Sequence, residues 1–224
     1  HDVNGIAASM VQFVPLDAPV KISRLTLRNT GTTARKLSIT GYAEWVLGPS
    51  RSATTAFVTT KPDPATGAIL AQNTFSTAFP GRIAFADLGA QASSITADRA
   101  EFIGPGGTLA APAALNGKPL SGRFGPALDP CAALQRRITL PPGQTAEIVF
   151  LIGQAENEVA ASALIQQMRA ADLDQILDAV KRHWADLLTS VQITSPDRAM
   201  DIMLNGWLLY QTLACRIWAR AGFY

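Results

Sequence analysis

The sequence predicts a mainly β protein that ends in helices. Short alternating apolar runs, separated by turns rich in Gly, Pro, Asn and Asp, fill residues 1–153, and a helical spacing of apolar residues begins after them. Many strands with no helix between them are typical of an antiparallel β-sandwich. We therefore expect a sandwich over residues 1–153, a helical linker over 154–194 and the start of an all-helical unit over 195–224.

The clearest strand runs from Leu37 to Leu47. Every second residue of it lies on one face, and this face is apolar: Leu37, Ile39, Gly41, Ala43, Trp45 and Leu47. Such alternation indicates a half-buried strand and places Trp45 in the core. Turn-forming residues at 29–31 precede the strand, so we predict a hairpin between Val20–Arg28 and Leu37–Leu47.

Other runs suggest further strands. Arg136–Leu140 and Ala146–Ile152 flank the turn at 141–144 and are predicted to pair as a second hairpin. Shorter β-like runs are Ala8–Val14, Thr54–Thr59, Ile83–Ala86 and Arg99–Ile103. The segment from Gly104 to Pro130 is rich in Gly and Pro and is expected to be a long loop.

Helical signals begin after residue 153. The segment Val159–Arg169 is predicted as one helix. Asp172 is the expected N-cap of the next, in which apolar residues recur at helical spacing: Leu173, Ile176, Leu177, Val180, Trp184, Leu187 and Leu188. Ser195 as an N-cap and Pro196 at the first helical position predict the start of a last helix.

This last helix is uncharged from Ile202 to Cys215 and apolar on almost every face. A helix of this kind is buried on all sides in a folded protein. The sequence ends a few residues later, so we expect these residues to be a piece of a longer protein that supplies the covering elements.

The composition describes a globular chain, since 48% of the 224 residues are hydrophobic and 16% are charged. The net charge of +2, with scattered basic residues, gives no reason to expect nucleic acid as a partner. The two cysteines, Cys131 and Cys215, are expected to be reduced, which fits a cytoplasmic protein. No apolar window reaches the roughly 18 residues of a membrane span, so no direct membrane contact is expected.

Few residues are spaced for catalysis or metal binding. His183 has no cysteine or carboxylate cluster at ligand spacing, so neither a metal nor another cofactor is expected. The glycine-rich segment 104–108 lacks the Lys-Ser/Thr pair of a P-loop. Asp197 and Asp201 share one helix face, but they also lie in the first helical turns, where the helix dipole favours acids. We interpret them as helix-start residues rather than as a catalytic carboxylate pair.

Two polar groupings remain as candidates. The residues of 98–101 can form a polar cluster, for which a surface or interdomain ion pair is the simpler interpretation: Asp98, Arg99 and Glu101. The chain end places guanidinium groups beside aromatic rings: Arg216, Trp218, Arg220, Phe223 and Tyr224. Aromatic faces stack on sugar rings and arginine binds phosphate with two donors, so the chain end is a candidate binding region.

Four segments resemble one enzyme family: YAEWVLG at 42–48, DRAEFIG at 98–104, DPCAALQ at 129–135 and NGWLLYQTLACRIWARAGFY at 205–224. They are similar to inverting glycoside phosphorylases related to cellobiose and chitobiose phosphorylase, above all to the phosphorylase-like C-terminal region of bacterial cyclic β-1,2-glucan synthases. The resemblance implies an antiparallel β-supersandwich over 1–153, a helical linker over 154–194 and the first helix of a truncated (α/α)6 catalytic barrel over 195–224.

The resemblance also implies an activity for the parent enzyme. A β-glucosidic bond would be cleaved by inorganic phosphate as co-substrate, with one aspartate as general acid. That aspartate lies in a downstream part of the family's barrel, so no catalytic residue is assigned here. Arg216, Arg220, Phe223 and Tyr224 lead into the family's substrate-binding loop and are assigned to the rim of the site. The implied role in cyclic β-1,2-glucan synthesis is control of chain length.

The implied partners are the downstream barrel of the same chain, a β-glucan oligosaccharide and a second copy in a homodimer. The implied location is the cytoplasm, with the parent anchored in the bacterial inner membrane through other domains. The segment itself is expected to support folding, dimerisation and carbohydrate binding. Two alternatives remain open. A stand-alone carbohydrate-binding sandwich predicts a row of exposed aromatics on one sheet face, and a pure assembly module predicts an exposed apolar patch on the last helix.

Overall fold

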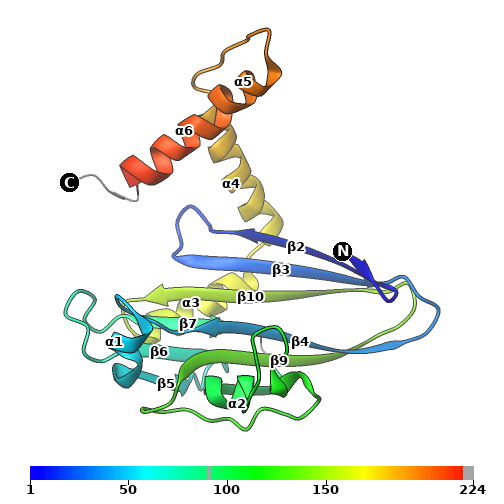
Figure 1. Ribbon diagram of the computed structural model, residues 1–224, viewed down its shortest axis with the longest axis vertical. Helices are drawn as coiled ribbons and strands as arrows, with labels where there is room; N and C mark the ends of the chain where they lie inside the picture. Colours follow the sequence, from blue (N-terminus) through cyan, green and yellow to red (C-terminus); the bar gives the residue numbers. More distant parts are fainter. Residues whose placement is uncertain (90–91, 219–224) are drawn as a thin grey trace. The chain divides into compact units, whose positions relative to one another are not determined.

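The computed structural model describes residues 1–89 and 92–218 (Figure 1). The chain divides into two compact units: unit 1 runs from His1 to Ala171 and unit 2 from Asp172 to Tyr224. Unit 1 contains all strands of the described residues, whereas unit 2 consists of helices joined by a loop. The expected fold class, mainly antiparallel β with C-terminal helices, is confirmed.

Unit 1 is built from two antiparallel sheets. The large sheet has the strand order β1–β2–β3–β10–β7–β6–β5. Its strands are β1 (Asp2–Val3), β2 (Ile6–Phe13), β3 (Val20–Asn29), β10 (Thr145–Ala155), β7 (Ile83–Asp87), β6 (Ile69–Asn73) and β5 (Val58–Pro62). The small sheet has the order β4–β9–β8, formed by β4 (Arg35–Glu44), β9 (Pro130–Leu140) and β8 (Ser94–Asp98).

The sheets pack against each other through apolar side chains. The core cluster draws buried residues from both: Leu27, Ile69, Ala86 and Ile148 from the large sheet, and Ala97, Ala132 and Leu134 from the small one. Trp45, directly after β4, is buried in the same cluster, as the alternation of its strand predicts. At Gly41 an added Cβ would meet the Phe150 ring at 2.4 Å, so the two sheets approach too closely there for any other residue.

Short helices and one long helix complete unit 1. They are α1 (Arg51–Thr54), a 3₁₀ turn (Thr55–Phe57), α2 (Arg99–Ile103), a second 3₁₀ turn (Ala113–Leu115) and α3 (Glu158–Ala170). α3 begins at Asn157, whose side chain accepts a hydrogen bond from the Ala160 N–H at 2.9 Å. Its buried residues are Ala161, Ile165 and Met168, and it lies beside β7 and β10. This helix agrees with the prediction for Val159–Arg169.

Both predicted hairpins are wrong, because the strands of each pair belong to different sheets. β3 pairs with β2 and β10, whereas β4 pairs with β9. The connections 30–34 and 141–144 therefore cross from one sheet to the other. Buried Asn29 joins the two crossings: its backbone N–H donates to the Gln144 carbonyl (3.0 Å), and its Nδ2 donates to the Leu140 carbonyl (2.8 Å). Turn residues signalled the bends correctly, but they do not specify which strand comes next to which.

The predicted strand Arg99–Ile103 is helix α2. Asp98 caps it, because its side chain accepts a hydrogen bond from the Ala100 N–H at 2.9 Å. Gly104 ends it in a left-handed conformation with φ of 78°. The cap residues outweigh the strand-like pattern of so short a run.

Of the other short predicted strands, two are confirmed and one is partly wrong. Ala8–Val14 and Ile83–Ala86 are confirmed as β2 and β7. Thr54–Thr59 is wrong in its first half, since Ser50 caps a helical segment that continues to Phe57, and β5 begins only at Val58.

Unit 2 contains α4 (Leu173–Leu188), α5 (Arg198–Ile202), a π-helical stretch (Met203–Trp207), α6 (Leu208–Gln211) and a second π-helical stretch (Thr212–Trp218). Asp172 caps α4 as predicted, accepting hydrogen bonds from the N–H groups of Asp174 and Gln175 at 3.0 and 3.1 Å. The N-cap of the last helix is Asp197 and not Ser195, because the Asp197 carboxylate accepts from the Ala199 N–H.

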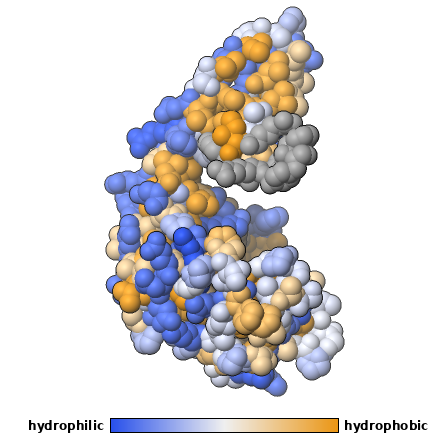
Figure 2. Space-filling model, turned by 90° about the vertical axis from the view of Figure 1, so that its left-hand side faces the viewer, coloured by the Kyte–Doolittle hydropathy of each residue, from blue (hydrophilic) through white to orange (hydrophobic). Residues whose placement is uncertain are grey.

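The described part of unit 2 has no buried core of its own. None of its residues from 172 to 215 is buried. Hydrophobic side chains instead cover much of its visible surface (Figure 2). The most exposed of the large ones are Val191, Met200, Ile202, Trp207 and Ile217. Within the described residues, no helix has the length and apolar character needed to cross a membrane.

Candidate functional site

The residues assigned to the rim of a substrate site cannot be placed. Arg220, Phe223 and Tyr224 lie outside the described residues. The backbone of Arg216 belongs to the last π-helical stretch, but its side chain also lies outside what the structure describes. Their assignment to a binding site therefore stays a prediction. The polar and charged groups described below belong to unit 1.

Four charged side chains form a closed cluster at one end of the small sheet. Glu44 receives hydrogen bonds from Arg51 (Nη1 to Oε2) and Arg99 (Nε to Oε1), both at 2.7 Å. Asp129 bonds to the same two guanidinium groups, with Arg51 Nη2 on Oδ1 and Arg99 Nη1 at 3.4 Å from Oδ2. We call these four residues the ion cluster. Its members come from the end of β4, the start of α1, the start of α2 and the residue before β9.

Three of the segments that carry the family resemblance meet in the ion cluster. YAEWVLG supplies Glu44, DRAEFIG supplies Arg99 and DPCAALQ supplies Asp129. Backbone bonds align them: the Arg99 N–H donates to the Asp129 carbonyl at 2.8 Å, and the Trp45 N–H donates to the Pro130 carbonyl at 3.1 Å. The sequence shows these segments as separate, and the fold brings them together.

Tyr42 lies next to the ion cluster and bonds to it. Its hydroxyl donates to Glu44 at 2.8 Å, and its ring stacks on Phe102 with centroids 4.5 Å apart. Burial and the hydrogen bond to Glu44 raise the Tyr42 pKa well above its usual range, so the phenol stays a donor. Burial alone would raise the pKa of Glu44, but the bonds from Arg99 and Tyr42 and the charge of Arg51 outweigh it and hold that pKa below its usual value.

The arrangement of the ion cluster is that of a structural link between segments rather than that of a reaction centre. Two guanidinium groups face two carboxylates, so its charge is balanced, and the pKa of Glu44 is held below its usual value. Cys131 beside it is unreactive, since burial, followed by the charges of Asp98 and Glu44, raises its pKa to about 12. Within the described residues no group of His, Cys, Asp or Glu side chains is arranged to hold a metal ion.

The three residues of the predicted polar cluster at 98–101 bond to different partners. Asp98 pairs with Arg123 at 2.6 Å, while Arg99 belongs to the ion cluster. Glu101 accepts from the Thr96 hydroxyl at 2.5 Å and from the Ser121 N–H at 2.7 Å. All three therefore tie the long loop to the small sheet, Asp98 and Arg99 through ion pairs and Glu101 through hydrogen bonds to uncharged groups.

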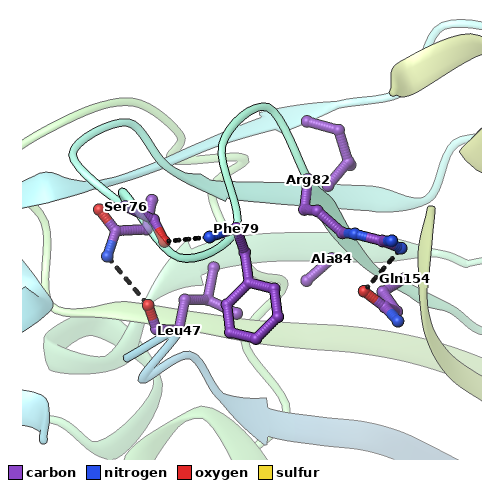
Figure 3. Close-up of a pocket in the computed structure, with 8 residues that line it drawn as sticks. Leu47, Ser76, Phe79, Arg82, Ala84 and Gln154 are labelled. Carbon is purple, nitrogen blue, oxygen red and sulfur yellow. Dashed lines mark hydrogen bonds between the residues drawn. The ribbon is translucent and has the colours of Figure 1, made fainter. Parts of the chain in front are cut away.

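A pocket of about 260 Å³ is lined by Leu47, the loop 74–82 and the end of β10 (Figure 3). Leu47, Phe79, Arg82 and Gln154 are among the residues that line it. In Figure 3 the Phe79 ring lies between Leu47 on one side and the Arg82–Gln154 pair on the other. Arg82 Nη1 donates to Gln154 Oε1 at 3.3 Å. The pocket thus combines one aromatic ring with two exposed polar side chains.

The wall of this pocket is held by hydrogen bonds. Asn73 Nδ2 donates to the Leu47 carbonyl at 2.9 Å, and Asn73 Oδ1 accepts from the Phe75 N–H at 2.9 Å. Ser76 Oγ accepts from the Phe79 N–H at 3.1 Å. Leu47 itself has a φ of 44°, a left-handed conformation that is costly for a leucine and that is often kept at functional sites.

Sequence reasoning missed this pocket. Its aromatic residue lies in a turn-rich segment with no strand or helix period, and its polar residues are 72 positions apart in the chain. The available signal was the segment TFSTAFPG at 74–81, which places two phenylalanines among turn-forming residues. The predicted row of aromatics on one sheet face is not found among the described strands, because Tyr42 stacks on Phe102 and Trp45 is buried.

The fold defines a class of protein: a two-sheet antiparallel sandwich that leads into helices. Residues 1–171 match the model of the glycosyl hydrolase 94 supersandwich domain, and residues 183–224 match that of the glycosyl hydrolase 94 superfamily catalytic domain. The chain therefore belongs to the glycosyl hydrolase 94 family.

Curated relatives agree with this family. A cyclic β-(1,2)-glucan synthase, NdvB, from Rhizobium meliloti is 42% identical over 92% of this chain and 7% of its own length. An N,N'-diacetylchitobiose phosphorylase from Vibrio furnissii is 25% identical over 98% of this chain and 28% of its own. A 3-O-β-D-glucopyranosyl-β-D-glucuronide phosphorylase from Paenibacillus borealis is 24% identical over 92% and 27%, respectively. The chain spans less than a third of each of these relatives.

Proposed function

We propose that this chain is the sandwich and first barrel helix of an inverting phosphorylase-type enzyme that acts on β-glucans, with β-1,2-glucan as its substrate. The observation that carries the proposal is the order of the two matched domains, a supersandwich followed by the start of a catalytic domain, in a chain 42% identical to a cyclic β-(1,2)-glucan synthase. The biological role is control of glucan chain length during cyclic glucan synthesis.

In this proposal inorganic phosphate is the co-substrate and attacks the anomeric carbon, while a single carboxylic acid protonates the leaving oxygen. We assign that acid to the barrel beyond the segment present here. Among the described residues the two carboxyl groups with shifted pKa values, Glu44 and Asp63, are both held below their usual range, which is opposite to the shift that a general acid needs.

The role of unit 1 is to support the barrel. The ion cluster fixes three family segments against each other at one end of the small sheet. The apolar surface of unit 2 is assigned to contact with the downstream (α/α)6 barrel of the same chain. The rim of the substrate site is assigned to Arg216, Arg220, Phe223 and Tyr224.

The test is a phosphorolysis assay on the enzyme that contains this segment. Linear β-1,2-glucan and inorganic phosphate should release glucose 1-phosphate in the α form, whereas cellobiose and N,N'-diacetylchitobiose should release far less sugar phosphate. Sugar release that does not depend on phosphate would contradict the proposal. Arg220→Ala should raise KM for glucan with a smaller change in kcat, as expected for a rim residue.

A second role, self-association, is favoured by one observation. Met200, Ile202, Met203, Trp207 and Leu208 are exposed and follow each other along the last helices. Contiguous exposed apolar residues are typical of protein–protein interfaces. Light scattering on the chain with and without residues 195–224 tests it: a dimer that becomes a monomer on deletion supports assembly through unit 2, and an unchanged mass contradicts it.

A further inference from the structure

The loop 74–82 exposes aromatic side chains, although hydrogen bonds hold its backbone in place. Phe75 and Phe79 are 73% and 66% exposed. Phe75 stacks on Phe57 with ring centroids 4.9 Å apart, whereas the Phe79 ring faces the pocket (Figure 3). An exposed aromatic ring in a concave site is typical of ligand binding rather than of folding.

The pocket is formed before any ligand arrives. Asn73 connects the end of β6 to Leu47, and Ser76 holds the backbone of Phe79. Such bonds fix the position of the ring, so little conformational entropy is lost when a ligand binds on it. Leu47 on the opposite wall of the pocket has a left-handed backbone conformation, which costs local stability. This strain is a second sign that the shape of the pocket is maintained for a function.

The polar groups of the pocket disfavour cationic ligands. Its lining contains no acidic side chain, so nothing there would bind a cation. Arg82 is its single basic side chain, and one of the five guanidinium N–H donors is already used on Gln154. The remaining guanidinium donors and the Gln154 Nε2 can donate to several hydroxyl groups along one edge of a neutral ligand.

The size of the pocket also limits the ligand. At about 260 Å³ it lies just below the roughly 300–1,000 Å³ of pockets for drug-sized molecules, so it accommodates about one ring. From this geometry we infer that the pocket of Phe79, Arg82 and Gln154 is a saccharide-binding subsite, in which one pyranose ring stacks on Phe79 and its hydroxyl groups bond to Arg82 and Gln154. The choice of a β-glucan as the saccharide rests on the proposed function; the site itself does not.

The pocket therefore gives the sandwich a holding site for glucan chains, formed by residues other than the rim residues assigned above. All residues used in the inference belong to unit 1. A polymeric substrate held at a second point stays near the enzyme between cleavage events, as in other bivalent binding.

The test is an NMR titration of the 224-residue chain with a linear β-1,2-gluco-oligosaccharide. We expect saturable shifts at the amides of residues 73–84 and at Gln154. Phe79→Ala should weaken binding by at least about tenfold, because the stacking surface is lost. Phe75→Ala removes an equally exposed ring of the same loop that does not line the pocket, and it should change the affinity by less than about twofold.

Gln154→Leu is a second variant, which keeps the side-chain volume while removing the hydrogen bonds, and it should also weaken binding. Amide spectra of the free variants show whether each one is folded. Failure of the folded chain to bind any saccharide, or equal affinity of the Phe79→Ala and Phe75→Ala variants, would overturn the subsite. Binding of N,N'-diacetylchitobiose with the same variant pattern, but not of β-1,2-glucan, would uphold the subsite and contradict the proposed substrate instead.

Discussion

Units 1 and 2 are similarly rich in apolar residues but use them differently. Unit 1 buries many of its large side chains, with Phe85, Ile22 and Leu134 fully enclosed. Unit 2 buries none of its residues from 172 to 215, although Asp172 and Asp197 cap its helices α4 and α5. Local signals such as caps and turn spacing are therefore enough to define helices, whereas a core requires elements that come from distant parts of the chain.

The largest expected difference concerns core truncation. Phe85→Ala should lower the free energy of unfolding of unit 1 by about 3–5 kcal/mol, because the removed ring leaves a cavity. Trp207→Ala in unit 2 removes a ring that is 53% exposed and should cost at most about 0.5 kcal/mol. Urea unfolding of both variants measures the contrast, and equal losses would mean that unit 2 contributes to the same core.

Breaking an ion pair should also cost more stability in unit 1 than in unit 2. In unit 1 Arg169 binds Asp87 through two bonds, Nη2 to Oδ1 at 2.6 Å and Nε to Oδ2 at 3.0 Å, and the Asp87 side chain is only 1% exposed. Arg169→Met leaves this carboxylate buried without its partner and should cost about 3 kcal/mol. Lys181→Met breaks the exposed pair with Asp178 in unit 2 and should cost close to nothing in the same urea measurement.

If the two substitutions had equal effects, Asp87 would be compensated by other groups. The Arg169 guanidinium also donates to the Thr66 carbonyl at 2.7 Å, so Arg169→Lys should recover only part of the loss. A complete recovery would show that charge alone holds α3 on the large sheet.

Acid should weaken unit 1 through Asp63. Burial alone would raise the pKa of this carboxyl, but the hydroxyls of Thr66 and Ser162 and the N–H of Ala65 bond to it and hold its pKa below the usual value. A lowered folded-state pKa means that the stabilisation is complete above the unfolded-state pKa of about 3.9 and is lost as the pH falls through the folded-state value.

Asp63→Asn should therefore cost about 1–3 kcal/mol at neutral pH and flatten the decline in stability between about pH 5 and pH 2. Urea unfolding at several pH values measures both effects. Asp178→Asn, on the exposed face of α4, is the matched control and should leave the acid profile unchanged. An identical profile for Asp63→Asn and the unmodified chain would contradict the prediction.

The smallest expected effect lies in unit 2, where caps replace a core. Asp172→Ala removes two hydrogen bonds at the start of α4 and should destabilise that helix by about 1 kcal/mol. Because α4 has no buried residue, amide hydrogen exchange in 173–188 should accelerate while exchange in the strands of unit 1 stays the same. A parallel acceleration in unit 1 would show that the two units unfold together.

The sequence predicted the elements better than their arrangement. Alternation placed Trp45 in the core, Val159–Arg169 was predicted as the helix that is α3, and Asp172 was identified as the cap of α4. Both hairpins were wrong because a turn signal does not state which sheet the next strand joins. α2 was missed because its five residues look like a strand and only the caps at Asp98 and Gly104 identify it as a helix.

The candidate site was even less accessible to sequence reasoning. The ion cluster joins residues 85 positions apart, from Glu44 to Asp129, and no local pattern predicts their contact. The pocket depends on a strained leucine and on a loop whose order comes from Asn73 and Ser76. Family resemblance identified the first of these regions by its segments, but not the second.

The two sheet crossings have a consequence for folding during synthesis, and Asn29 illustrates it. Asn29 bonds to Leu140, 111 positions later. β3 pairs with the preceding strand β2 on one edge, but its other edge pairs with β10, and β4 pairs with β9. At roughly 5–20 residues per second, a ribosome needs about 5 to 20 seconds to add those residues. Throughout this interval β3 and β4 carry unpaired edges that can recruit strands of other chains. The nascent protein is thus expected to need protection by a chaperone until Ala155 has emerged, and to close both sheets in one late step.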